Sequence, residues 1–357
     1  MYMKINRYLD FDMENKQIVA DIKDTLVNCP FLEEMAGKTI FITGATGMIG
    51  AMIIKVLQTY NNHHNNAAIH IVANIRNQEK AQHKLVEYID KNIEWVVGDI
   101  CTPIVYDKPI DYIIHCASTT TSQDFVCKPV ETIKTALTGT LNVLSFAHQK
   151  SIKKMIYTSS LEVYGIPDTF EVTEESNGRI DWTNVRSSYS EGKRMAECIC
   201  RSYFSEYGVP IVIARLAQTF GAGFEPTDNR VYAQFVRAAV SGQDIVLRTK
   251  GATVRNYCYL TDAVTALLLL CIKGVPGEAY NVANEYTTCS IAEMAKIVEN
   301  LSNGKTKVVF DLSTDTTQLG YNPEMKIKLL SNKLQELGWK PKNDIQMAFK
   351  KAINGLK

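Results

Sequence analysis

Short apolar runs alternate with longer segments of helical spacing along the chain from residue 38 onward. Runs of this length predict strands, and apolar residues three and four apart predict amphipathic helices. The predicted strands are 38–43, 68–73, 93–100, 111–118, 153–160 and 210–216, and the clearest helices are 51–60, 77–88, 129–150 and the segment around Tyr189. Because apolar strands alternate with helices, the pattern predicts an α/β fold with a parallel sheet covered on both faces.

The pattern is less regular at both ends of the chain. Residues 1–37 look helical and partly amphipathic, and we expect an extra docked extension there. After about residue 222, short strands and helices are mixed, which predicts a smaller C-terminal α/β lobe. We therefore expect a first domain over 38–221 and a second, substrate-binding lobe over 222–357, in keeping with a length above the usual size of one hydrophobic core.

Composition excludes several classes of protein. The chain carries a formal net charge of +1, which gives no reason to expect nucleic acid or a membrane surface as a partner. The most apolar segment, 264–274, is shorter than the roughly 20 residues that span a bilayer, so it predicts a buried helix. The nine cysteines show no zinc-binding spacing. We therefore expect no metal site, and reduced thiols in the cytoplasm.

Three glycines follow the first predicted strand and open the first helix: Gly44, Gly47 and Gly50, in FITGATGMIG. Glycines at this spacing allow a tight turn, close approach of a pyrophosphate and close packing of helix on strand, and the helix N-terminus attracts the anion. The turn predicts a dinucleotide-binding site in a Rossmann-type, doubly wound parallel sheet. Further contacts to the cofactor are expected from Thr46, Met48 and Ile49.

The choice between NAD and NADP depends on the end of the second strand. An acid there would bind the ribose hydroxyls, but the sequence has Asn74, with Arg76 close by. The missing acid and the added arginine leave NADP possible beside NAD. Asp99 and Ile100 end the third strand, where the carboxylate is placed to reach the adenine amine or, alternatively, only to shape a turn.

A tyrosine and a lysine lie four residues apart in RSSYSEGKRMAE (186–197), which places Tyr189 and Lys193 on one face of a helix. A phenol has a pKa of about 10 and is a poor base at neutral pH. A nearby ammonium lowers that pKa by stabilising the phenolate. A hydroxyl from YTSS, at the end of a strand, can hold a substrate oxygen while its proton leaves. Together these groups suit the removal of a hydride and a proton from an alcohol.

With these motifs the chain resembles the extended short-chain dehydrogenase/reductase family, in the branch of nucleotide-sugar epimerases, dehydratases and decarboxylases. The resemblance covers roughly residues 38–350 and implies that Ser160, Tyr189 and Lys193 are catalytic and that a homodimer forms. It implies further cofactor contacts from HCAS, namely Cys116, Ala117 and Ser118. In GATVRNYCYLTDAV it implies that Arg255 grips the substrate diphosphate. Gln218 and Arg230 are further candidates for substrate binding, although a surface role for Arg230 is equally open.

The resemblance also implies the reaction. Members of this branch oxidise the sugar of a nucleotide diphosphate sugar at carbon 4 with recycled NAD, and extra groups decide the second step. Glu162 is such a group, because an extended backbone would point it the same way as Ser160; a solvated carboxylate at the rim is the alternative. The motifs are most similar to those of UDP-glucuronate decarboxylases, although leucine precedes the glutamate here. A 4-epimerase, a 4,6-dehydratase, a net reductase and a non-catalytic dinucleotide sensor are the alternatives.

Overall fold

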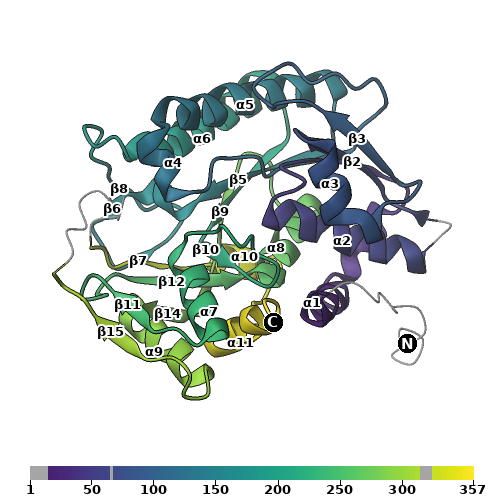
Figure 1. The fold of residues 1–357 in the computed structure, drawn as a ribbon. Helices are drawn as coiled ribbons and strands as arrows, with labels where there is room; N and C mark the ends of the chain where they lie inside the picture. The colour runs from purple at the N-terminus through teal and green to yellow at the C-terminus, as the bar shows by residue number, and fades with distance from the viewer. Residues whose placement is uncertain (1–14, 65–66, 314–323) are drawn as a thin grey trace.

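A central parallel sheet organises the computed structural model, which describes residues 15–64, 67–313 and 324–357. The seven strands run in the order β13-β9-β5-β4-β1-β2-β3 (Figure 1). Their bounds are β1 (Thr39–Thr43), β2 (His70–Ile75), β3 (Ile93–Val97), β4 (Tyr112–His115), β5 (Lys154–Ser160), β9 (Ile211–Leu216) and β13 (Ala279–Val282). The chain starts mid-sheet at β1, builds outward to β3 and returns to β4 on the other side. Such a reversal opens a ligand-binding position at the carboxyl ends of β1 and β4.

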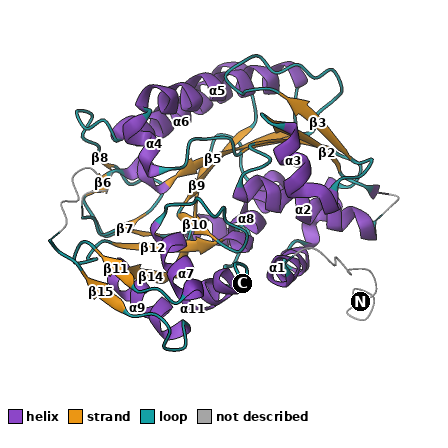
Figure 2. Cartoon of the chain, in the orientation of Figure 1, coloured by secondary structure: helices purple, strands orange, loops and turns teal. Residues whose placement is uncertain are grey.

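Helices cover both faces of this sheet because alternate strand residues point to opposite sides. Ile40 and Ile42 of β1 pack in a cluster with α1, α2 and α8, whereas Phe41 packs in another with α5 and α6. Figure 2 shows the resulting three layers. The helices of this part of the chain are α1 (Lys16–Val27), α2 (Met48–His63), α3 (Gln78–Leu85), α4 (Ser122–Cys127), α5 (Pro129–Lys150), α6 (Ser187–Tyr207) and α8 (Leu260–Lys273), with short 3₁₀ helices η2 (Pro30–Met35), η4 (Val86–Tyr88) and η5 (Leu161–Tyr164).

A second hydrophobic core lies in the C-terminal part, where three helices pack on a three-stranded sheet of order β10-β12-β14. Its elements are β10 (Gln218–Phe220), α7 (Val231–Ser241), β12 (Val254–Tyr259), β14 (Asn284–Ser290), α9 (Ile291–Leu301) and α11 (Ile345–Asn354). The smaller elements are β6 (Ile166–Pro167), β7 (Glu171–Val172), β8 (Gly178–Arg179), β11 (Ile245–Leu247), β15 (Val308–Phe310), β16 (Lys328–Leu329) and α10 (Asn332–Glu336). Between them, α8 and β13 return the chain to the central sheet.

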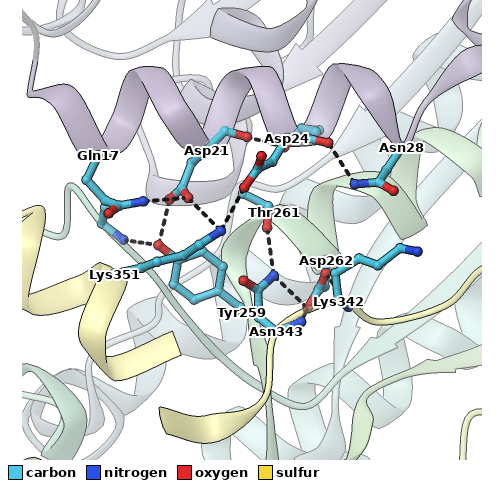
Figure 3. A network of polar contacts seen from close by, with 12 residues as sticks. Gln17, Asp21, Asp24, Asn28, Tyr259, Thr261, Asp262, Lys342, Asn343 and Lys351 are labelled. Carbon is cyan, nitrogen blue, oxygen red and sulfur yellow. Dashed lines mark hydrogen bonds and ion pairs between the residues drawn. The ribbon is translucent and has the colours of Figure 1, made fainter. Parts of the chain in front are cut away.

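Helix α1 ties the N-terminal segment to the C-terminal part of the chain (Figure 3). Asp21 is fully buried and accepts hydrogen bonds from the Tyr259 hydroxyl at 2.6 Å and from Gln17 at 3.1 Å. Lys351 of α11 lies 3.2 Å from the same carboxylate and 2.9 Å from that of Asp24. The extension is therefore a packed element with its own buried ion pair, apart from residues 1–14, which lie outside the described residues.

The predicted fold class is confirmed, with a doubly wound parallel sheet and a smaller C-terminal α/β part. The helix predicted over 129–150 has those bounds as α5, and 264–274 falls in α8, whose first twelve residues are buried. The helix predicted near 77–88 is instead split into α3 and η4. The domain boundary at residue 222 stays a prediction, and α8 and β13 lie in the central part although they come after it.

Candidate active site

The glycine turn joins β1 to α2 and contacts the loop that follows β4. Gly44 has φ of +65°, and a Cβ atom there would lie 2.7 Å from the backbone nitrogen of Ala117. A Cβ atom on Gly50 would lie 2.4 Å from the Gly44 carbonyl oxygen. Only glycine fits either position, because one needs the left-handed region and both lack space. Gly47 caps α2, and among the described residues no side chain caps this helix. The first backbone N–H groups of α2, from Met48 onward, can therefore bind an anion.

The loop after β4 is fixed against β1 by a hydroxyl. Thr43 Oγ1 accepts a hydrogen bond from the Ala117 amide at 3.1 Å and lies 2.7 Å from Nδ1 of His115. Burial, with the charge of Lys193 as a smaller cause, lowers the pKa of His115 to about 3, so this imidazole is neutral at physiological pH. The contact brings Cys116 and Ala117 beside Gly44, and Ser118 follows them in the same loop. The structure thus brings together two of the predicted cofactor segments.

The groups at the ends of β2 and β3 are also close to each other. Asn74 is buried, and its side-chain amide donates to the Val96 and Gly98 carbonyl oxygens, each at 3.2 Å. Arg76 Nη1 lies 3.9 Å from Asp99 Oδ2, and both side chains are exposed. Asp99 also accepts a hydrogen bond from its second neighbour along the chain, as the turn alternative required. The positive charge of Arg76 is thus partly offset by the carboxylate of Asp99.

Two further predicted contacts of the cofactor lie at the borders of this region. The Ile100 side chain packs against Gly139 of α5, where a Cβ atom would lie 2.6 Å from its Cδ1. Met48, at the start of α2, packs against both hydrophobic cores. The fit of a dinucleotide therefore rests on the glycine cradle, the uncapped helix start and the two loops that meet there. Thr46 lies in the same turn.

The predicted catalytic residues come from β5 and α6. Ser160 is the last residue of β5, and α6 carries Tyr189 and Lys193 one turn apart. Lys193 is buried, and its Nζ donates to the Thr158 carbonyl oxygen at 2.7 Å. The same nitrogen lies 6.0 Å from the centroid of the Tyr189 ring. The three side chains thus share one edge of the sheet.

The groups of the chain itself do not lower the pKa of Tyr189 overall, and the effect expected of Lys193 on the phenol stays a prediction. Burial, followed by the negative charge of Glu162, raises the pKa of Tyr189 to about 12, although the Ser160 hydroxyl and the charges of Arg230 and Arg186 lower it. Burial also lowers the pKa of Lys193 to about 8 against the charge of Glu197, so the ammonium itself is weakened. The lysine also joins α6 to β5 through its hydrogen bond to the Thr158 carbonyl oxygen.

Phe125 completes this arrangement and was missed in the sequence. Its ring stacks on that of Tyr189, with centroids 4.2 Å apart and an angle of 10° between the planes. Its carbonyl oxygen accepts a hydrogen bond from the Ser188 hydroxyl at 2.9 Å, which joins α4 to the start of α6. Phe125 and Tyr189 are 64 positions apart, so no local pattern brings them together. The stack restricts the ring of Tyr189 to one plane.

Glu162 does not lie on an extended backbone as expected. β5 ends at Ser160, whose hydroxyl accepts the Glu162 amide hydrogen at 3.2 Å and caps η5. The turn directs Glu162 to Arg186, whose Nη1 and Nη2 donate to its two oxygens at 2.9 Å each. Burial would raise the pKa of Glu162, but the hydrogen bonds and charge of Arg186, with help from Ser190 and Arg255, lower it. The carboxylate is therefore paired, and the rim alternative is wrong because the group is mostly buried.

The predicted substrate contacts come from the C-terminal part of the chain. Arg230 precedes α7 and donates from Nε to Asp228 at 3.0 Å, and its charge reaches Tyr189. Arg255 lies in β12, and its charge reaches Glu162. Its Nε is buried without a hydrogen-bond partner among the described residues, which suits a site that receives an anionic ligand. Gln218 of β10 pairs in register with Tyr257, two residues beyond Arg255.

Comparisons with known proteins agree with this geometry. The model of the NAD dependent epimerase/dehydratase family matches residues 40–283. UDP-glucuronic acid decarboxylase 6 of Arabidopsis thaliana is 30% identical over 81% of this chain and 85% of its own length. dTDP-D-glucose 4,6-dehydratase of Homo sapiens is 27% identical over 88% of this chain and 89% of its own. The solved UDP-glucuronic acid 4-epimerase of Bacillus cereus, in complex with NAD, superposes with a TM-score of 0.70 at 18% identity, covering 89% of this chain and 98% of that one. The chain belongs to the NAD-dependent epimerase/dehydratase family.

Proposed function

We propose that this protein is an enzyme that decarboxylates a UDP-linked uronic acid of the UDP-glucuronate type, by oxidising the sugar at carbon 4 and returning the hydride to the product. Bound NAD supplies the hydride acceptor and donor. The curated relatives that match include UDP-glucuronic acid decarboxylases, and the motifs of this chain are most similar to theirs. The observation that carries the proposal is that Ser160, Tyr189 and Lys193 lie at one edge of the sheet. The positive charges of Arg186 and Arg230 reach the same phenol.

The residues of the chain have separate tasks in this proposal. Ser160 holds the hydroxyl at carbon 4, and Tyr189 takes its proton and later returns it. Lys193 of α6 holds β5 in place through its hydrogen bond to the Thr158 carbonyl oxygen. Arg255 and Arg230 bring positive charge to the diphosphate side, and Gln218 adds a neutral hydrogen-bonding group. Oxidation at carbon 4 gives a β-keto acid, so that the bond between carbon 5 and the carboxylate breaks and carbon dioxide leaves as electrons move into the carbonyl. The resulting enolate takes up a proton from solvent at carbon 5, and the hydride then returns to carbon 4.

The environment of Glu162 argues against dehydration. A 4,6-dehydratase needs an acid to protonate the departing hydroxyl. Leu161 is buried in the hydrophobic core with 3% of its surface exposed, so it offers none. Glu162 is held by Arg186 with a lowered pKa, so it is a poor acid as well. Decarboxylation and 4-epimerisation need no such group, and the likeness in fold to a UDP-glucuronic acid 4-epimerase keeps epimerisation as the second candidate.

A panel of nucleotide sugars tests the proposal. Purified protein is incubated with UDP-glucuronate, UDP-glucose, dTDP-glucose and GDP-mannose, and products are followed by mass spectrometry. We expect loss of carbon dioxide from UDP-glucuronate with no net consumption of NAD. Loss of water would show a dehydratase, and an isomeric product of unchanged mass would show an epimerase. Net consumption of added NADPH would show a reductase, and no turnover would favour a cofactor-binding sensor.

A homodimer and a cytoplasmic location complete the proposal. Exposed apolar residues follow one face of α5 at helical spacing, at Val130, Ile133 and Leu141, and Met195 of α6 is also exposed. Such a stripe on neighbouring helices suits pairing with a second copy. All nine cysteines are free thiols, which suits a reducing compartment. No helix in the part of the chain that the structure describes is long and apolar enough to cross a membrane.

A further inference from the structure

Arg186 forms a two-pronged ion pair with Glu162 in the candidate site. It precedes α6, and 8% of its surface is exposed. Nη1 and Nη2 donate to Oε2 and Oε1 of Glu162, each at 2.9 Å. The Ser190 hydroxyl, one turn further along α6, donates to Oε2 at 2.9 Å. Both carboxylate oxygens are thus occupied, so that rotation of the carboxylate would break at least two hydrogen bonds.

Arg186 also lies against the aromatic pair that contains Tyr189. Its guanidinium carbon is 5.5 Å from the centroid of the Phe125 ring. Phe125 stacks in turn on Tyr189, with centroids 4.2 Å apart. One guanidinium therefore contacts the ring that packs on the phenol and the carboxylate whose charge acts on the phenol. No other arginine among the described residues has both of these contacts.

We propose that Arg186 is a positioning residue that fixes the orientation and charge of Glu162 beside Tyr189. It acts on the reaction only through the side chains of Glu162 and Tyr189. The proposal rests on the proposed function, because Tyr189 is taken as the proton carrier. In this proposal α6 has two tasks: it carries Tyr189, and the residue at its start, Arg186, determines the charge next to the phenol. Glu162 is then an electrostatic neighbour of Tyr189 instead of a group that acts directly in the second step.

The charges around Glu162 give the physical reason. It faces Arg186 from the loop before α6, Ser190 and Tyr189 from α6, and Arg255 from β12. A buried carboxylate without a cation is driven to the neutral form by the loss of water. The hydrogen bonds and charge of Arg186 lower the pKa of Glu162 against this effect of burial, so Glu162 is charged. Its negative charge in turn raises the pKa of Tyr189. A phenol with a high pKa gives a strongly basic phenolate, which favours removal of the proton from the hydroxyl at carbon 4 in the first step.

The test combines titration of Glu162 with a double-mutant cycle. The variants are Arg186→Gln, Glu162→Gln and their double variant, with Arg186→Lys as a milder change if Arg186→Gln does not fold. Arg201→Gln is the matched control, because Arg201 is an exposed arginine on α6. For each variant, the midpoint of thermal unfolding is measured against pH, retained NAD is measured after denaturation, and kcat and KM are measured for the substrate that the panel identifies.

The unfolding measurement has a defined sign. With Arg186 present, the pKa of Glu162 is lowered in the folded state, so its stabilisation is full above its ordinary value of 4.5 and is lost as the pH falls through the folded value. Without Arg186, burial raises the pKa of Glu162 in the folded state above its ordinary value of 4.5. Glu162 then destabilises the fold as the pH rises above 4.5. We therefore compare two differences in unfolding midpoint: that between the wild type and Glu162→Gln, and that between Arg186→Gln and the double variant. We expect these two differences to change with pH in opposite directions.

The kinetic measurement follows the same logic. We expect Arg186→Gln to lower kcat about 10- to 100-fold and to move the acid limb of the pH profile upward, with retained NAD unchanged. In the Glu162→Gln background we expect a smaller effect, because only the direct charge of Arg186 on Tyr189 is then lost. Equal effects in both backgrounds, or a pH dependence of unfolding that is the same with and without Arg186, overturn the proposal. A different product from the panel overturns the proposed decarboxylation alone, because the unfolding measurement needs no substrate.

Discussion

The hydroxyl of Tyr259 donates a hydrogen bond of 2.6 Å to the carboxylate of Asp21, across 238 positions of the sequence. Tyr259 ends β12, whose residue Arg255 is a predicted substrate contact, and its oxygen also accepts the Ala222 amide hydrogen at 3.3 Å. Ala222 lies in the segment between β10 and Arg230. The N-terminal helix therefore supports the backbone on which two candidate substrate contacts lie.

Removal of the cation in this network is expected to destabilise the protein. In Lys351→Met the fully buried Asp21 loses its charged partner, and we expect a loss of about 3 kcal/mol in the free energy of unfolding at pH 7. Burial raises the pKa of Asp21 although Tyr259 and Lys351 lower it, so the loss is expected to be smaller near pH 4, where Asp21 is protonated more readily.

Chemical denaturation at both pH values measures this effect. Lys350→Met is the matched control, because Lys350 is the exposed neighbour on the same helix. An equal loss in the two variants would show that Asp21 and Lys351 contribute no more than a surface charge.

Loss of the phenol should remove turnover and leave the fold intact. We expect Tyr189→Phe to lower kcat about 1,000-fold, since proton transfer by a positioned side chain contributes about 10²–10⁴-fold. The ring still stacks on Phe125, so the unfolding midpoint and the amount of bound NAD should stay near those of the wild type. Tyr207→Phe on the exposed end of α6 serves as control. Near-normal turnover in Tyr189→Phe would mean that another group carries the proton.

The glycine turn predicts a selective loss of cofactor. In Gly44→Ala the new Cβ meets the backbone of Ala117 at 2.7 Å and must adopt a φ of +65°, so the turn and the β4 loop have to move apart. We expect the affinity for NAD, measured by isothermal titration, to fall at least tenfold, which corresponds to about 1.4 kcal/mol. Gly98→Ala is the control, because nothing lies within 4 Å of its Cβ position. Unchanged binding in Gly44→Ala would place the dinucleotide elsewhere.

The buried ammonium predicts a rise in stability in alkali. The pKa of Lys193 is lowered by burial to about 8 in the folded state from an ordinary 10.5, so the unfolded chain binds more protons between these values. Stability therefore rises with pH across this window, by about 3 kcal/mol in total. We expect the unfolding free energy of the wild type to increase from pH 8 to 10 relative to that of Lys193→Met. A constant difference would mean that the lysine titrates normally.

The sequence predicts well what local patterns determine. The strands, the long helices and the glycine turn follow from periodicity and from the needs of the backbone, and α5 has the predicted bounds. The helix that carries Tyr189 and Lys193 is equally local. Cytoplasmic location, dimerisation and the roles of single site residues stay predictions.

The failures arise where distant groups compete for the same side chain. Ser160 was expected to continue an extended backbone, but its hydroxyl caps η5 and turns Glu162 toward Arg186. The pKa of Tyr189 was expected to be lowered, but burial and the charge of Glu162 raise it to about 12. Arg186 stood in the motif, yet nothing local showed that its partner lies 24 residues upstream. Such pairings depend on how β5 and α6 pack, which the period of a single element does not contain.

The last strand of the central sheet also determines when the protein can fold during synthesis. β13 pairs with β9 at the sheet edge, and 62 residues separate the end of β9 from the start of β13, in which the chain builds β10, β12 and α8. A ribosome must therefore release the chain beyond Val282 before the edge of the nucleotide-binding layer is closed. Until then β9 is an open edge with unpaired backbone groups, and a nascent chain stalled in this interval is the form most exposed to aggregation.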